Sequence, residues 1–249
     1  MLMAFKLYNL LSFKGQPDMT LEGLTPCSWY SRGPFDSVAV GKWASEQASD
    51  LLIVDFEALC GDVRIQSAEC VAQGHAQRIA AFRAARKEKK NPRAKVGTYA
   101  MCPNADYWTP VSPTEDKMLA WQGSNRFNSL IADEMDVVNP SLYAFYDDEK
   151  GWLKFALANI EEAYKYGKPV IPFICPHYHH SDPKFRNTMI PYFGTILDTV
   201  RERCDSAILW GGWWFGSKDV GKGDEPGHPW PWEPNFAWFK EVQRIVRGL

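Results

Sequence analysis

The sequence contains no run of 18 or more apolar residues, which is the length that a membrane-spanning helix needs. No GxGxxG or GxxxxGK[ST] motif follows an expected strand, and this weakens a nucleotide-binding interpretation. The six cysteines form no CxxC pair, which argues against a zinc ribbon. The net charge of −2 gives no reason to expect a nucleic acid or an anionic membrane as a partner. We therefore expect no cofactor, no nucleic-acid partner and no membrane partner.

Length and composition indicate one globular catalytic domain spanning residues 1–249, because 249 residues with 45% hydrophobic content suit a single domain of barrel size. A chain of this size does not need a disulfide framework, and we expect several cysteines to be buried thiols. The first eleven residues have no basic segment before an apolar run, and they predict a strand better than a signal peptide. We expect a soluble protein, and its compartment stays open, with secretion included; the oligomeric state stays open too.

Strands and helices alternate along most of the chain. Apolar runs predict strands, and three- to four-residue periodicity predicts helices. The strands are expected at residues 5–11, 25–30, 51–57, 95–101, 136–143, 169–175 and 207–212, and the helices at 64–90, 114–135, 148–166, 184–204 and 234–246. In the helix at 64–90, the expected core face holds Ile65, Ala68, Val71, Ala72, Ile79 and Phe82. Repeated βα units predict a parallel sheet, either closed into a barrel or open and doubly wound.

Two carboxylates end the most apolar of these strands, in the run Leu51-Leu-Ile-Val-Asp55-Phe-Glu57. Alternate residues of a strand share one face, and active sites of β/α barrels lie at the carboxyl ends of the strands. Two neighbouring carboxyl groups cannot ionise equally easily, so one can stay protonated near neutrality and act as a general acid. A helix-capping acid beside a surface glutamate is the simpler alternative.

Polar and aromatic residues collect after the other strands, and the sequence has 11 tryptophans. Flat rings with a polar edge suit stacking on sugar faces, although many of them must also form core. With carboxylates as acid and base, the pattern predicts a carbohydrate site. The candidate substrate-binding residues are Tyr99, Tyr107, Asn139, Tyr143, Tyr146, His177, Trp210 and Trp213. The Gly-, Pro- and Trp-rich segment 211–232 is either a substrate wall or an ordered surface loop.

Two other functions stay open. His177, His179 and His180 lie within four residues, and an extended loop would let His177 and His179 bind one metal ion in a metal-dependent hydrolase or lyase. No HExxH motif supports that site, and our preferred interpretation includes no metal. The second alternative is a non-catalytic barrel that binds glycans through its aromatic residues.

Several strand ends resemble the hyaluronidase family of glycoside hydrolases. Ile-Val-Asp55-Phe-Glu57 resembles its Asp-x-Glu strand, and Asn139-Pro-Ser-Leu-Tyr143 resembles its Pro-Ser-Val-Tyr segment. Similar matches occur in the same order at Val-Gly97-Thr-Tyr99-Ala, Lys168-Pro169-Val-Ile-Pro-Phe and Ala207-Ile-Leu-Trp210-Gly211. The run 50–57 also resembles the chitinase pattern Asp-x-x-Asp-x-Asp-x-Glu, except that Ile53 replaces the second acid. The matches cover about residues 50–215 and leave the N-terminal part unmatched.

The resemblance implies a distorted TIM-type (β/α) barrel with about seven or eight parallel strands. It implies hydrolysis of β-glycosidic bonds in a polysaccharide or oligosaccharide containing N-acetylhexosamine, in which the substrate's acetamido group is the nucleophile. Glu57 would be the general acid, and Asp55 would hydrogen-bond to it and tune it. Tyr143 and Tyr99 would position the N-acetyl group, and Trp210 would line the floor of the site. The glycan, its linkage and the mode of attack are not specified.

Overall fold

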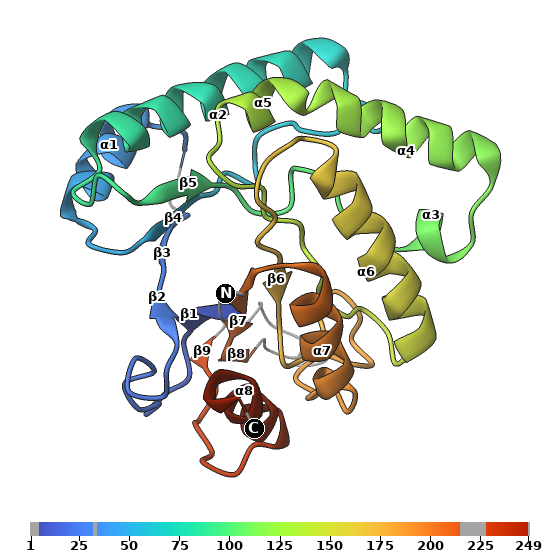
Figure 1. Ribbon diagram of the computed structural model, residues 1–249. Helices are drawn as coiled ribbons and strands as arrows, with labels where there is room; N and C mark the ends of the chain where they lie inside the picture. Colours follow the sequence, from blue (N-terminus) through green and yellow to red (C-terminus); the bar gives the residue numbers. More distant parts are fainter. Residues whose placement is uncertain (1–4, 32–33, 215–227, 249) are drawn as a thin grey trace, which may run out of the picture. The chain divides into compact units, whose positions relative to one another are not determined.

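The computed structural model describes residues 5–31, 34–214 and 228–248, and Figure 1 shows their helices and strands. Residues 215–227, which belong to the segment expected to be a substrate wall or loop, lie outside the described residues. The chain divides into two compact units. Unit 1 comprises Met1–Thr25, Leu142–Leu153 and Phe173–Leu249, and unit 2 comprises Pro26–Ser141 and Lys154–Pro172.

Unit 2 is built on a parallel sheet with the order β3-β4-β5. These strands are β3 (Ser28–Tyr30), β4 (Leu51–Val54) and β5 (Lys95–Gly97). Every side chain of β4 is fully buried, as expected for a strand covered on both faces. The apolar run predicted this central strand, but regular pairing ends at Val54 rather than at Glu57.

Parallel pairing continues beyond β5 through isolated bridges. One joins Tyr99 to Asn139, and another joins Val138 to Val170. The segment expected as a strand at 136–143 therefore lies in a sheet-like position without forming a regular strand. The strand expected at 169–175 is regular only at Phe173–Ile174, and its first part pairs through the bridge at Val170. Gly97 allows the close approach, since a Cβ atom there would overlap the carboxamide oxygen of Asn139.

The helices of unit 2 begin and end near the expected residues, with two additions. They are α1 (Ser37–Glu46), α2 (Ala68–Glu88), α3 (Trp108–Val111), α4 (Glu115–Phe127) and α5 (Ser129–Asp133), while α6 (Glu149–Tyr164) belongs to both units. No helix was expected at α1 or α3. α1 begins at Asp36, whose carboxylate accepts hydrogen bonds from the amides of Val38 and Ala39. α1 packs along α2 (Figure 1).

The buried face of α2 differs from the expected one. Ile65 precedes the helix and is exposed, and Ala68 and Ala72 are exposed as well. The face that is buried holds Val71, Gly74, His75, Arg78, Ala81, Phe82 and Ala85. The apolar pattern was misleading because two titratable residues and a glycine occupy core positions of this helix.

The helix expected at 114–135 is divided between α4 and α5 at Asn128. The side-chain amide of Asn128 donates to the carbonyl of Met101 and to the side chain of Asn104. Asn128 is fully buried, so these bonds satisfy the N–H groups of a carboxamide that would otherwise be costly to bury.

Unit 1 contains a sheet with the order β2-β1-β7-β6, in which β7 pairs in parallel with both β1 and β6. Its strands are β1 (Lys6–Leu11), β2 (Thr25–Pro26), β6 (Phe173–Ile174) and β7 (Ser206–Gly211). A short antiparallel pair, β8 (Trp213–Trp214) and β9 (His228–Pro229), follows β7. Helices α7 (Phe193–Arg203) and α8 (Ala237–Arg247) pack against each other. The helix expected at 184–204 begins only at Phe193, two residues after Pro191, because a proline ring is not accommodated in a helix interior.

Among the described residues, no helix is long and apolar enough to cross a membrane. Cys102, Cys175 and Cys204 are buried, as expected of cysteines in apolar contexts. Cys60 and Cys70 form a disulfide, which the sequence analysis did not anticipate.

We predict that Gly97→Ala lowers the free energy of unfolding by about 1–3 kcal/mol, because the added methyl group overpacks the contact with Asn139. Gly123→Ala is the matched control, since a Cβ atom at Gly123 in α4 meets open space. Urea denaturation of both variants measures the difference. Equal stability of the two variants would contradict the tight packing at Gly97.

Candidate active site

Asp55 and Glu57 lie directly after the central strand of unit 2. The amide of Asp55 donates to the carbonyl of Tyr30 at 2.8 Å, which extends the β3–β4 pairing by one residue. The chain then turns, and the amide of Leu59 donates to the carbonyl of Phe56 at 3.1 Å. Asp55 is 3% exposed, whereas Glu57 is exposed. The shared strand face that alternation predicted is therefore replaced by a turn that buries one carboxyl group and exposes the other.

Both carboxyl groups line one pocket of about 460 Å³, which lies within unit 2. This volume falls within the range of small-ligand sites, roughly 300–1,000 Å³. The pocket walls include Phe35, Phe56, Leu59 and Gln77 in addition to the two acids. The aromatic rings of Phe35 and Phe56 pack edge to face, with centroids 5.5 Å apart. The pocket thus joins an acid pair to an apolar aromatic wall.

Burial, and after it the negative charge of Glu57, raise the pKa of Asp55 to about 7. The positive charge of Arg78 and hydrogen bonding from Trp29 oppose this shift without cancelling it. Near pH 7, Asp55 is therefore partly protonated. The sequence predicted that one of two adjacent carboxyl groups stays protonated near neutrality, and the group with the raised pKa is Asp55 rather than the expected acid Glu57.

Three other predicted site residues belong to unit 2. The hydroxyl groups of Tyr99 and Ser141 are 3.2 Å apart, and Tyr99 forms a bridge with Asn139. Asn139 is fully buried, and its side-chain amide donates to the carbonyl of Ile171. Tyr107 is 7% exposed and packs against the rings of Trp108 and Phe155. Tyr107 and Asn139 are thus core residues by their contacts, and their binding roles stay predictions.

Three of the remaining predicted residues form an aromatic cluster in unit 1 together with His179. We call it the Tyr143 cluster, and it contains Tyr143, His177, His179 and Trp210. The ring of Tyr143 stacks on Trp210 at 5.5 Å and on His179 at 6.1 Å. His177 packs beside Trp210 with ring centroids 5.9 Å apart. The structure therefore brings together three residues that the sequence predicted separately, namely Tyr143, His177 and Trp210.

His177 is buried, and burial lowers its pKa to about 4, so its imidazole is neutral near pH 7. Its Nε2 atom accepts from the amide of Gly212 at 3.4 Å, which places the proton on Nδ1, 3.1 Å from the carbonyl of Tyr178. His179 also has its pKa lowered to about 4 by burial. Both rings therefore act as neutral hydrogen-bonding groups.

Tyr146 and Trp213 also belong to unit 1. The carbonyl of Tyr146 accepts from the hydroxyl of Tyr192 at 2.9 Å, and its ring lies near that of Phe145. Trp213 is half-buried in β8, paired with Pro229. Within the part of the chain that the structure describes, no group of three or more His, Cys, Asp or Glu side chains is placed to hold a metal ion.

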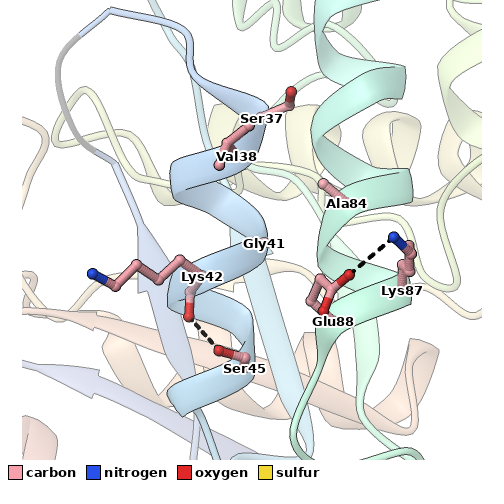
Figure 2. Close-up of a pocket in the computed structure, with 8 residues that line it drawn as sticks. All are labelled: Ser37, Val38, Gly41, Lys42, Ser45, Ala84, Lys87 and Glu88. Atoms are coloured by element: carbon pink, nitrogen blue, oxygen red, sulfur yellow. Dashed lines mark hydrogen bonds and ion pairs between the residues drawn. The ribbon is translucent and has the colours of Figure 1, made fainter.

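A second pocket of unit 2, about 350 Å³, lies between α1 and α2 (Figure 2). Its walls include Val38, Gly41, Lys42, Ala84, Lys87 and Glu88, and the one acid among them is ion-paired with Lys87. None of the residues predicted to be catalytic lines it. The acid pair beside Phe56 is therefore the stronger candidate for chemistry.

Sequence reasoning missed the residues that surround the acid pair from elsewhere in the chain, namely Trp29, Phe35, Gln77 and Arg78. One signal was available, because Arg78 lies seven residues after Val71 and four before Phe82 on the buried stripe of α2. An arginine at a core position needs buried partners, and these were not visible in the local sequence.

No protein-family model and no curated protein matches this sequence. Among solved structures, the chain is similar to bee venom hyaluronidase, with a TM-score of 0.62 and 16% identity over 83% of this chain and 91% of that one. Bee venom hyaluronidase in complex with a hyaluronic acid tetramer has a TM-score of 0.50 and 20% identity, covering 65% of this chain and 60% of that one.

At these identities the likeness establishes the fold alone. The chain has the TIM-type (β/α)-barrel fold of the α/β class, which confirms the fold expected from the sequence. The extent of a single domain over residues 1–249 stays a prediction, since the contacts divide the chain into two compact units.

Asp55→Asn is expected to stabilise the protein above pH 7. The folded protein holds the Asp55 proton more tightly than the unfolded chain, whose aspartates have a pKa near 3.8, so wild-type stability falls as pH rises from about 4 to about 7. At 1.36 kcal/mol per pKa unit, the variant gains up to about 4 kcal/mol at pH 8 and little at pH 4. Melting temperatures across this range test the prediction, and a gain that is constant with pH would contradict it.

Proposed function

We propose that this chain is a glycoside hydrolase that cleaves β-glycosidic bonds, with Glu57 as the general acid. The observation that carries the proposal is one pocket that contains an exposed Glu57 beside a buried Asp55 with a raised pKa. A strongly perturbed carboxyl group in a pocket is characteristic of catalytic sites. The fold likeness to bee venom hyaluronidase supports the same conclusion, since that protein has the same fold class.

The proposed substrate is a polysaccharide or oligosaccharide that contains N-acetylhexosamine. The match of residues 50–57 to both the hyaluronidase and the chitinase patterns supports this choice. The hyaluronic acid tetramer bound by the structural neighbour supports an oligosaccharide ligand. The reaction then needs no second enzyme nucleophile, because the substrate's own acetamido group supplies one.

In the first step, the acetamido carbonyl oxygen attacks the anomeric carbon while the bond to the leaving oxygen breaks. Glu57 donates its proton to that oxygen, and a cyclic intermediate forms on the sugar. In the second step, water attacks the anomeric carbon, the ring reopens and Glu57 takes the proton back. Glu57 is suited to this role because it is the pocket-exposed member of the pair.

Asp55 stores a proton near neutral pH. In the proposed mechanism, Asp55 passes this proton to Glu57 once a sugar fills the pocket. Ionised Asp55 is then stabilised by Arg78, by hydrogen bonding from Trp29 and by a hydrogen bond from the backbone of Phe56, the three groups that lower its pKa. The proton is thus placed on the residue that contacts the leaving oxygen.

The proposed binding roles of the other residues rest on the resemblance and on their chemistry. Trp210, which is half-buried and stacks on the buried Tyr143, has a flat ring that suits a sugar face. Tyr99, Tyr107, Asn139, Tyr146, His177 and Trp213 stay candidates for further sugar contacts. The Cys60–Cys70 disulfide favours a secreted location, because disulfides persist in oxidising compartments.

Glu57→Gln is expected to lower kcat by at least about 10³-fold while glycan binding persists, because the amide keeps the shape but has no proton to donate. Reducing-end release from hyaluronan, chondroitin, chitin oligomers and uncharged β-glucans measures turnover. Glu69→Gln is the matched control, since Glu69 is exposed in the first turn of α2. Wild-type rates in Glu57→Gln would reject the assignment.

The same assay with EDTA separates the alternatives. Activity that EDTA abolishes would favour a metal-dependent enzyme using His177 and His179. Binding of a glycan by the wild type without any product release would favour a non-catalytic glycan-binding barrel.

The pH profile gives an independent test. We expect kcat/KM to fall as pH rises through about 7, because Asp55, the neighbour of the proposed general acid, then loses its proton. Asp55→Asn removes the group that titrates near pH 7. The fall of kcat/KM above about pH 7 should therefore disappear, and kcat should decrease by about 10²-fold. If kcat/KM of Asp55→Asn still falls near pH 7 as in the wild type, that fall belongs to the titration of a different group.

A further inference from the structure

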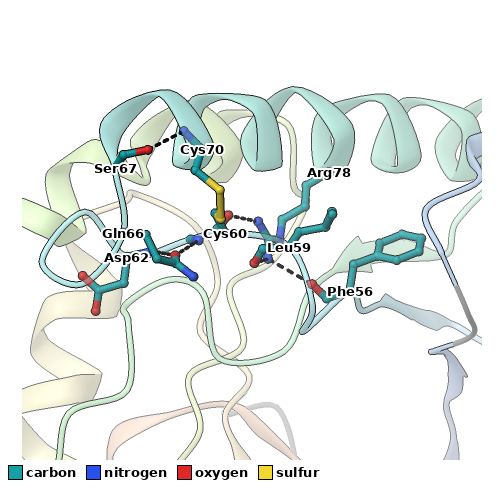
Figure 3. Close-up of a disulfide and its surroundings, with 9 residues drawn as sticks. Phe56, Leu59, Cys60, Asp62, Gln66, Ser67, Cys70 and Arg78 are labelled. Atoms are coloured by element: carbon teal, nitrogen blue, oxygen red, sulfur yellow. Dashed lines mark hydrogen bonds between the residues drawn. A yellow bond between two sulfur atoms is a disulfide. The ribbon is translucent and has the colours of Figure 1, made fainter.

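The loop that carries Glu57, residues 56–60, is hydrogen-bonded through its backbone to one buried side chain. The guanidinium of Arg78 donates to the carbonyls of Phe56 at 3.0 Å, Leu59 at 2.8 Å and Cys60 at 2.7 Å. Figure 3 shows the Arg78 side chain extending from α2 to this loop. The carbonyls on both sides of Glu57 are therefore held by a single planar group.

Two other residues of α2 hold the same loop. Cys70, Gly74 and Arg78 are spaced four residues apart and therefore follow one another along one face of the helix. Cys70 forms the disulfide with Cys60, and a Cβ atom at Gly74 would overlap the carbonyl oxygen of Cys60. The loop is thus joined to the helix in two ways (Figure 3). The disulfide joins it at Cys60, and the guanidinium joins it at the carbonyls of Phe56, Leu59 and Cys60.

Arg78 is 2% exposed, and burying a cation is costly unless other groups compensate for lost water. Its hydrogen bonds among the described residues go to neutral carbonyls, and its charge also acts on Asp55. Burial lowers the pKa of Arg78 to about 10, so the guanidinium remains charged near neutral pH. Arg78 consequently has both a geometric link to the Glu57 loop and an electrostatic link to Asp55.

We propose that Arg78 is a positioning residue of the active site, which holds Glu57 at the pocket by hydrogen-bonding the loop on both sides of it. The proposal rests on the proposed function, in which Glu57 is the general acid. Arg78 touches neither the reacting atoms nor the sugar. Its contribution is to the placement of the acid, where misplacement by about 1 Å can cost about 10²-fold in rate.

Arg78→Met removes the planar guanidinium group and its positive charge. We expect kcat to fall about 10- to 100-fold, with KM changed by less than about 3-fold. The alkaline limb of the pH profile should move to higher pH, because the positive charge of Arg78 lowers the pKa of Asp55. Arg78→Lys keeps the positive charge but lacks the planar guanidinium group. The alkaline fall of its pH profile should therefore stay near the wild-type pH, while its kcat remains reduced. Arg83→Met is the control on the same helix, since Arg83 is largely exposed.

Gly74→Ala provides a second test that leaves Arg78 intact and applies even if Arg78→Met does not fold. The added methyl group would displace the loop at Cys60, so kcat should fall about 10-fold with the pH limb unmoved. Gly123→Ala, a glycine in α4 with open space around it, should keep wild-type kcat.

The outcomes separate this inference from the proposed function. A wild-type enzyme inactive on every glycan would reject the proposed function itself. The positioning role alone would be overturned by the following combination. The wild type is active and Glu57→Gln is inactive, but Arg78→Met keeps the wild-type kcat and pH profile and Gly74→Ala keeps the wild-type kcat. A lower melting temperature in Arg78→Met with unchanged kcat and pH limb would likewise mean that Arg78 is only structural.

Discussion

The hydrogen bonds from Arg78 to the loop after β4 are the interaction on which the candidate site depends. A strand that ends in the interior leaves carbonyl groups that neither water nor a neighbouring strand can satisfy. Arg78 supplies donors for Phe56, Leu59 and Cys60, which allows the chain to leave the sheet immediately after Asp55. The turn that follows exposes Glu57 in the pocket and leaves Asp55 buried beneath it.

This arrangement couples the stability of the fold to the chemistry of the site. Burial of Asp55 next to Glu57 is unfavourable above neutral pH, and the charge of Arg78 offsets only part of that cost. Strained or destabilised groups of this kind are common at active sites, where the surrounding structure maintains them. In unit 2 that structure is the fully buried β4 on one side and α2 on the other, with the Cys60–Cys70 disulfide joining the loop to the helix.

Sequence reasoning succeeded where the signal was a long, regular pattern. The apolar run at 51–54 identified the central strand, and the helices at 148–166 and 234–246 were found within a few residues of α6 and α8. It failed where short polar contacts override the pattern. α1 was missed, the predicted helix at 114–135 breaks at Asn128, and the strand at 136–143 pairs only through isolated bridges.

The sequence by itself determined that two carboxyl groups follow a buried strand of a repeated βα chain, because hydrophobicity and residue order are local properties. Only the tertiary structure decided which carboxyl group is buried and which residue supports the loop between them. Arg78 lies 22 residues from Phe56 along the chain, and a hydrogen bond across that separation leaves no local pattern. The stacking of Tyr143 on Trp210 was likewise decided by packing, because contact between residues so far apart depends on how strands are paired rather than on their neighbours in sequence.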